Sequence, residues 1–196
     1  MHFTLADLIT DITQNAVEAE SDTVELQICE CSLKKDTSID DAASRSREFR
    51  FLVKDNGKGM TKEEVNRAID PFVTDGIKHP NRKVGLGLPF LVQMAEQSNG
   101  GWDIKSEKGK GTVVKAWFDS ENVDTPPVGD LPGMFRTILT FNTQAEIIIR
   151  RLKEKDGDKE EYELRKSELT EALGSLEEAG SLVLLDQYLR SLENEE

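Results

Sequence analysis

The sequence predicts an α+β fold, and two periodicities carry that prediction. Apolar residues recur at the helical period over residues 4–20, whereas apolar and polar residues alternate over residues 23–33 and again from Phe49 to Val53. Both patterns return further along the chain. With 196 residues, the chain is long enough to bury a hydrophobic core without disulfides or metals.

The predicted elements follow one another in a helix–strand–strand–helix order. The first helix carries an apolar stripe made by Leu5, Leu8, Ile9, Ile12, Ala16 and Ala19. Two strands follow, joined by a polar hairpin loop. Thr61 is the N-cap of a short helix, and Glu64 completes a capping box three residues later. A further helix opens at the glycines near residue 85 and ends at Gly100 and Gly101.

The second half of the chain divides at a cluster of prolines. Strands over 102–106 and 112–118 flank the turn EKGKG, and the proline-rich break follows them. We expect an N-terminal domain at residues 1–120, a Pro/Gly linker at 121–133 and a small α+β appendage at 134–196. Within the appendage, the patterns predict a helix at 134–142, a hairpin of EIIIRRLK and EYELRK, and a helix at 181–192. An alternative is that the appendage packs as an extra layer on the first domain.

Charge and hydropathy exclude several classes of function. The net charge is −13 with no basic stripe, which argues against nucleic-acid binding. No apolar run approaches the length that spans a bilayer, and the first residues carry acids in place of a basic leader. We therefore expect a cytoplasmic protein without a membrane partner.

The two cysteines, Cys29 and Cys31, lie in a predicted strand with one residue between them. Residues two apart in a strand point to the same face, which we take as poor geometry for a mutual disulfide. The sequence therefore predicts two reduced, structural thiols. With two histidines in the chain, a zinc site is not expected.

Three short stretches carry candidate chemistry. Asp11 and Asn15 are four residues apart on one helical face, DNGKGM follows a strand, and KVGLGLPFL opens a helix. Taken singly, each has an ordinary structural explanation: a solvated helix edge, a turn and a helix start. Neither the dinucleotide fingerprint nor the P-loop pattern is present.

The order and spacing of these stretches resemble the GHKL ATPases. That superfamily joins the ATP-binding domains of gyrase, heat-shock chaperones, mismatch-repair proteins and histidine kinases, and the resemblance covers residues 4–118. It implies a two-layer α/β sandwich of the Bergerat type with a mixed sheet, binding ATP and Mg²⁺. Over the whole chain, the sequence looks most like small stand-alone ATP-binding proteins that are often encoded beside iron-only hydrogenase subunits.

The resemblance assigns roles at the adenine end of the site. The carboxylate of Asp55 would accept a hydrogen bond from the adenine amino group. Gly57 and Gly59 would let the backbone approach the base, with Met60 beside them. Thr112, in GKGT, would support Asp55 and an adenine nitrogen.

At the phosphate end, the amide oxygen of Asn15 would be a ligand of Mg²⁺. The stretch Gly85, Leu86, Gly87 and Leu88 would offer backbone N–H groups at a helix N-terminus, where phosphate binds well. Asp11 occupies the position where hydrolysing members keep a glutamate that activates the nucleophile.

The segment between these motifs resembles a histidine-kinase lid. Phe72 would pack beneath it, and Lys83, Lys78 or Arg82 would reach the terminal phosphates; which of the three does so stays open. His79 has no phosphoacceptor context.

Two functions follow from the sequence. Because no phosphoacceptor helix precedes the ATP motifs, the first is an ATPase or protein kinase that hydrolyses ATP slowly or phosphorylates a separate protein. The second is a non-catalytic module whose protein binding depends on nucleotide. Whether the appendage contacts that partner or forms a homodimer is left open.

Overall fold

The computed structural model describes residues 3–34, 45–70, 87–155 and 158–193. Within those ranges, six strands form one sheet in the order β3-β4-β2-β1-β5-β6. The strands are β1 (Thr23–Lys34), β2 (Arg45–Asp55), β3 (Gly101–Glu107), β4 (Gly111–Asp119), β5 (Glu146–Lys155) and β6 (Asp158–Arg165). Neighbouring strands are antiparallel except β1 and β5, which are parallel. The predicted α+β fold with a mixed sheet is confirmed.

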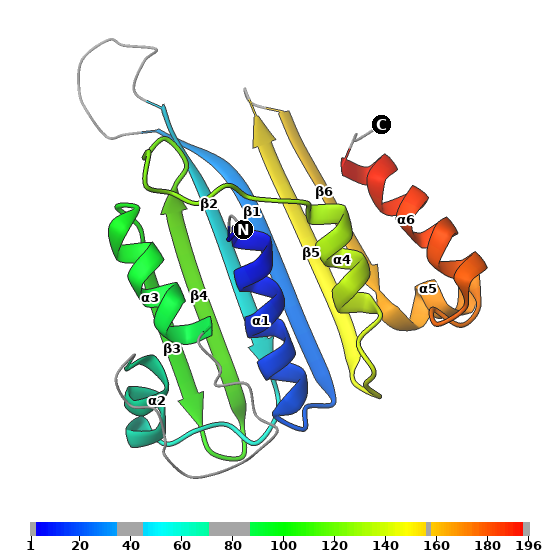
Figure 1. The fold of residues 1–196 in the computed structure, drawn as a ribbon, viewed down its shortest axis with the longest axis horizontal. Coiled ribbons are helices and arrows are strands. Elements are labelled where there is room, and N and C mark those ends of the chain that lie inside the picture. The colour runs from blue at the N-terminus through cyan, green and yellow to red at the C-terminus, as the bar shows by residue number, and fades with distance from the viewer. Residues whose placement is uncertain (1–2, 35–44, 71–86, 156–157, 194–196) are drawn as a thin grey trace.

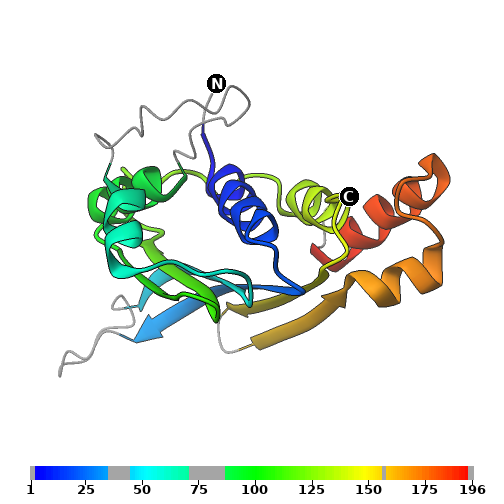
Figure 2. The same ribbon diagram turned by 90° about the horizontal axis from the view of Figure 1, so that it is seen from below.

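The helices lie on one face of this sheet (Figures 1 and 2). They are α1 (Leu5–Glu18), α2 (Lys62–Ile69), α3 (Gly87–Gln97), α4 (Leu131–Leu139), α5 (Lys166–Leu173) and α6 (Ala179–Glu193). α1 crosses the middle of the sheet between α3 and α4, and Figure 2 shows no described helix over the opposite face. The sheet therefore has a covered face and a bare face.

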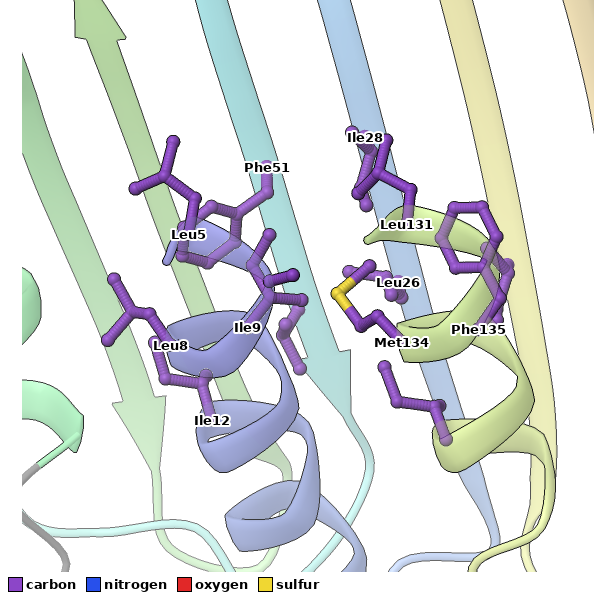
Figure 3. Packing of buried hydrophobic residues seen from close by; sticks show 14 of the residues in the cluster. Leu5, Leu8, Ile9, Ile12, Leu26, Ile28, Phe51, Leu131, Met134 and Phe135 are labelled. Atoms are coloured by element: carbon purple, nitrogen blue, oxygen red, sulfur yellow. The ribbon is translucent and has the colours of Figure 1, made fainter. Parts of the chain in front are cut away.

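The apolar stripe of α1 forms the centre of the core. Leu5, Leu8 and Ile9 are fully buried, and Figure 3 shows them pointing from α1 toward the strands. α4 adds a second apolar face beside α1; Figure 3 shows its Met134 beside Leu26 of β1 and its Phe135 on the side toward β5. One continuous core therefore lies beneath both helices.

α4 begins earlier than the sequence predicts. The expected start at residue 134 is wrong, because the helix runs from Leu131 with Asp130 as its N-cap. The Asp130 carboxylate accepts a hydrogen bond from the Gly133 N–H at 2.9 Å. Pro132 lies in the first turn, where a missing N–H costs nothing. The proline that indicated a break is therefore part of a helix start.

The segment before α4 also closes the N-terminus of α1. The N–H groups of Leu5 and Ala6 donate to the carbonyls of Pro127 and Val128, at 3.0 and 2.9 Å. The first N–H groups of a helix have no partner within the helix, so these carbonyls replace water there. The proline-rich segment is thus bonded to the helix that carries Asp11 and Asn15.

β5 and β6 extend the sheet at the open edge of β1. The N–H of Glu146 donates to the Asp22 carbonyl at 2.9 Å, and the β1–β5 register runs from Thr23 and Glu146 onward. On the bare face, the Arg150 guanidinium contacts Glu25 of β1 at 2.8 Å and Glu163 of β6 at 2.5 Å. The C-terminal segment therefore packs as a continuation of the sheet.

On the covered face, a buried cation ties the C-terminal helix to this extension. Arg151 is 2% exposed and pairs with Glu30 of β1 and with Glu193 at the end of α6. Lys153 and the Tyr162 hydroxyl also contact the Glu193 carboxylate. Burial, followed by the contact with Glu193, raises the pKa of Tyr162 far above its ordinary value, so this hydroxyl stays protonated.

Cys29 and Cys31 are joined by a disulfide, so the prediction of two reduced thiols is wrong. Both side chains lie on the same face of β1, as predicted. Their Cα atoms are 5.9 Å apart, which is within the range that disulfides span. Placement on one face was expected to prevent a bridge, but in the structure it brings the two sulfurs together.

We predict that the described fold unfolds in a single cooperative transition. Phe135→Ala in α4 and Ile12→Ala in α1 each delete a buried side chain, and each should cost about 3–4 kcal/mol. Because one core and one sheet join the two regions, both variants should lower the midpoint of the same transition in urea. Two separable transitions, with each variant moving only one of them, would show that residues 134–196 form an independent domain.

Candidate functional site

A pocket of about 340 Å³ opens between α1 and the strands β2 and β4. It lies on the covered face of the sheet, where α2 and α3 complete its rim. Its lining residues are Ile12, Asn15, Ala16, Glu18, Ala19, Val53, Asp55, Lys58, Gly59, Met60, Ala68, Leu88, Thr112 and Val114. The volume lies within the range of small-ligand sites, and a few polar groups stand in a mostly apolar wall, as such sites require.

Asp55 is the buried acid of this pocket. It ends β2 with 6% of its surface exposed. The Gly57 N–H donates to its Oδ1 at 2.8 Å, and the backbone of Thr112 gives a second hydrogen bond. Burial raises the pKa of the Asp55 carboxyl above its ordinary value of 3.8, and the two backbone hydrogen bonds act in the opposite direction. The carboxylate is thus held in place by the backbone with its remaining acceptor capacity free for a donor on a ligand.

Two glycines beside Asp55 are required by the close approach of backbone segments. A Cβ on Gly57 would lie 2.4 Å from the Ala19 carbonyl oxygen. Gly59 has φ +60° and a Cβ there would lie 2.0 Å from the Glu107 carbonyl oxygen. The family resemblance assigns both glycines to the approach of the base. The structure shows that each also lets the DNGKGM loop pack against α1 or the β3–β4 turn.

A hydroxyl pair fixes the far side of the pocket. The Ser106 and Thr112 hydroxyls are 2.9 Å apart, and the Met60 N–H donates to the Ser106 hydroxyl at 2.7 Å. These contacts join the loop after β2 to β3 and β4. Sequence reasoning found Met60 and Thr112 but missed Ser106, because a serine in a predicted strand carries no local signal of this pairing.

Asn56 is another residue that sequence reasoning missed. Its side-chain oxygen accepts hydrogen bonds from the Asp22 and Thr23 N–H groups, at 2.9 and 3.0 Å. These contacts anchor the turn between α1 and β1 to the loop that carries Asp55. The asparagine of the DNG turn is thus structural, and the aspartate before it faces the pocket.

Asn15 and Asp11 occupy different positions relative to the pocket. Asn15 lines it from the exposed side of α1. Asp11 is exposed one turn earlier and is absent from the lining that the described residues form. Its Oδ2 would lie 3.1 Å from a Cβ built on Gly87, the first residue of α3. Asp11 therefore lies beside a helix N-terminus, and a side chain at Gly87 would crowd its carboxylate.

Some of the remaining predicted site residues lie within the described ranges, and others lie outside them. Gly87 is buried and Leu88 lines the pocket. Phe72, Lys83, Gly85 and Leu86 lie outside the described residues. The apolar wall, including Ile12, was predicted as core, and Glu18 and Lys58 were not predicted as site residues. Charged side chains on a helix and in a turn do not reveal from sequence that they border a cavity.

Comparison with known proteins agrees with this geometry. The family model described as histidine kinase-, DNA gyrase B- and HSP90-like ATPase matches residues 3–122. The cell-division control histidine kinase PdhS of Brucella canis is 37% identical over a segment covering 36% of this chain and 8% of the kinase. Sporulation kinase E of Bacillus subtilis is 29% identical over 56% of this chain and 13% of its own length. The matched segments thus span a small part of each kinase.

A solved structure, described as the N-terminal domain of a DNA repair protein, also aligns with the chain. The TM-score is 0.47 with 14% identity, over 91% of this chain and 58% of the other.

Because the family model spans more than half of the chain, this protein belongs to the histidine kinase-, gyrase B- and HSP90-like ATPase family. The resemblance to the GHKL ATPases is confirmed, and the family implies nucleotide binding. In the part of the chain that the structure describes, no helix has both the length and the apolar character needed to cross a membrane.

We predict a graded cost for alanine at two glycines with positive φ. Gly109 has φ +79° and open space around it, so Gly109→Ala should cost only the backbone strain, about 1–2 kcal/mol. Gly59→Ala adds the clash with the Glu107 carbonyl and should cost about 3 kcal/mol or more. Urea unfolding of both variants tests this. Equal costs would show that the loop moves freely away from the β3–β4 turn.

Proposed function

We propose that this protein binds ATP with Mg²⁺ in the pocket above β2 and β4, and that it slowly hydrolyses ATP or transfers its terminal phosphoryl group to a separate protein. The observation that carries the proposal is Asp55, a nearly buried carboxylate fixed by two backbone hydrogen bonds in a mostly apolar pocket. A carboxylate in this setting is an acceptor without competing water, which suits the amino group of adenine.

The adenine ring would lie between the apolar walls of the pocket. Ile12 and Ala16 of α1 line one side, whereas Val53 and Val114 belong to the sheet. An aromatic ring gains free energy from burial between such walls, and Asp55 sets its orientation. The Thr112 hydroxyl, held by Ser106, stands beside the carboxylate as a second polar contact.

The phosphates would extend toward Asn15 and the start of α3. The amide of Asn15 lines the pocket and forms no side-chain hydrogen bond with the described residues, so its oxygen is available as a metal ligand. This fits Mg²⁺, which takes one or two protein oxygens and fills its shell with water and phosphate. Bound there, Mg²⁺ would neutralise phosphate charge. The first turn of α3, which begins at Gly87, would offer backbone N–H groups on the same side.

Asp11 is our proposed base for hydrolysis or phosphoryl transfer. It lies on the same side of α1 as Asn15, one turn toward the N-terminus, and next to Gly87. The carboxylate would accept a proton from the attacking water or hydroxyl, directly or through one further water. Because aspartate is one methylene shorter than glutamate, we propose a slow reaction.

A binding module without catalysis is the second candidate, and one observation favours it. Asp11 is exposed and stands outside the lining of the pocket formed by the described residues. In this case, ATP would serve as a ligand that alters protein binding. We propose that residues 134–196 contact the protein partner. Three exposed apolar side chains on α6 support this: Val183, Leu184 and Tyr188.

We predict that Asp55→Asn abolishes ATP binding. The substituted amide presents an N–H₂ group where the carboxylate offers only acceptors, so a donor on adenine loses its partner. Calorimetry with ATP and Mg²⁺ measures the effect, with Asp103→Asn as the matched control because Asp103 lies on the bare face of β3. Unchanged affinity in Asp55→Asn would refute the whole pocket assignment.

We also predict that Asp11→Asn stops ATP hydrolysis while ATP binding is retained, because the amide cannot accept the proton. Asp11→Glu restores one methylene and should raise the rate above wild type by about tenfold or more, within the range of general-base effects. Phosphate release under saturating ATP and Mg²⁺ measures both variants. A wild-type rate in Asp11→Asn would exclude Asp11 as the base.

Incubation with γ-labelled ATP, first of the protein alone and then in lysate, distinguishes the candidates. Released phosphate supports hydrolysis, and a labelled second protein supports phosphoryl transfer. Binding with neither product, unchanged in Asp11→Glu, supports the module without catalysis.

A further inference from the structure

The disulfide of Cys29 and Cys31 lies on the bare face of the sheet, opposite the nucleotide pocket. Ile28 points into the core, so its neighbours in β1 point the other way, and both cysteines are partly exposed. Arg50 of β2 stands opposite Cys29 in the ladder, and Leu152 of β5 flanks it on the other side. The bridge is therefore accessible and has a cation as a direct neighbour.

A second hollow, about 580 Å³ in volume, surrounds this position on the bare face. Its lining includes Cys29, Arg50, Lys115, Trp117, Arg150 and Leu152. Two carboxylates, from Glu48 and Glu161, also line it. Three cationic side chains on the bare face, those of Arg50, Lys115 and Arg150, thus lie beside two acids of the lining, in a chain whose net charge is −13. Arg151 also lines the hollow, but its side chain is buried and pairs with Glu193. Cationic side chains are thus grouped here on an acidic protein, with several carboxylates beside them.

The three cationic side chains on the bare face differ in whether they already form ion pairs with acids. Arg50 pairs with Glu48, and Arg150 pairs with Glu25 and Glu163. Lys115 is exposed and has no ion-pair partner among the described residues. It lies next to Trp117 along the same side of β4, two residues away. Asp103 stands opposite Lys115 in the β3–β4 ladder but pairs with Lys105 at 3.3 Å, so an incoming anion can contact Lys115 without breaking an ion pair.

A bridge between residues two apart contributes little to the fold. The stabilisation from a disulfide rises with the length of the loop it closes, and this loop holds a single residue between the cysteines. The pairing of β1 with β2 and β5 already fixes both positions. An accessible bridge with little structural use is the kind that undergoes exchange with other thiols.

We propose that this hollow is a thiol–disulfide exchange site for small anionic thiols. A thiolate RS⁻ attacks the Cys29 sulfur, which lines the hollow; the new S–S bond joins R to Cys29, and Cys31 leaves as a thiolate. A second RS⁻ then attacks the R sulfur of that mixed disulfide, releasing RSSR and the Cys29 thiolate. Two thiolates are oxidised, and the protein disulfide gains the two electrons.

The charges of the hollow favour each step. Arg50 stabilises the Cys29 thiolate that leaves in the second step, because a neighbouring cation favours the charged sulfur. Lys115 attracts carboxylates on the incoming thiol, and Trp117 with Leu152 offers apolar contact for its carbon chain. The ligand class is therefore a low-molecular-weight thiol that carries carboxylate groups.

The experiment measures reduction of the full-length oxidised protein by three probes: reduced glutathione, which is anionic, 2-mercaptoethanol, which is neutral, and cysteamine, which is cationic. Concentrations are matched for thiolate, and free cysteines are alkylated and counted by intact mass. Lys115→Gln should slow the reaction with glutathione by about threefold or more and leave the neutral probe unchanged. Lys54→Gln is the matched control, because Lys54 is an exposed lysine on the same face but outside the hollow.

A further variant traps the intermediate. In Cys31→Ser, oxidised glutathione should leave one glutathionyl group on Cys29. Equal effects of Lys115→Gln and Lys54→Gln, or equal rates with all three probes, would overturn the proposal. So would two free thiols in wild-type protein held in excess oxidised glutathione. ATP binding is not involved in any of these readouts, so failure here leaves the proposed nucleotide function untouched.

Discussion

The burial of one side of α1 against the sheet is the interaction on which the rest of the structure depends. Leu5, Leu8 and Ile9 have no exposed surface, and Ile12 has almost none. Deleting one such side chain costs about 2–5 kcal/mol, a large share of the stability of a typical domain. Because side chains on a helix keep fixed angles to one another, this burial also sets the direction of Asn15 toward the pocket.

The same helix is held at its ends by segments that are remote in sequence. Carbonyls at 127–128 pair with its first N–H groups, and Asn56 binds the turn that follows it. That turn also carries Asp22, whose carbonyl accepts from the first residue of β5. The pocket beside α1 and the C-terminal strands therefore share hydrogen-bonded backbone. A partner that binds the C-terminal helices would act on elements that are bonded to the pocket.

Local chemistry explains which parts of the site were predictable. Thr61 with Glu64 forms the expected capping box, and Asp55 follows an alternating strand at the point where a glycine-rich turn begins. These signals lie within a few residues of one another. Asn56 acts through partners more than thirty residues away, and Ser106 links Thr112 of the neighbouring strand to the remote Met60 N–H, so no single local pattern could identify them. The start of α4 was not predicted because a proline such as Pro132 is equally typical of a chain break and of the first turn of a helix.

By itself, the sequence determined the order of most helices and strands and the family, and it singled out Asp55 and Asn15 as candidates for nucleotide binding. Hydrophobic periodicity and turn-forming residues can be recognised within a few neighbouring residues, so they can be found without the three-dimensional structure. Only the tertiary structure decided that the C-terminal hairpin continues the sheet, that Cys29 and Cys31 form a bridge, and that Asp11 lies beside Gly87. Each of these depends on strand pairing or helix packing between distant segments, which the sequence does not encode at any one place.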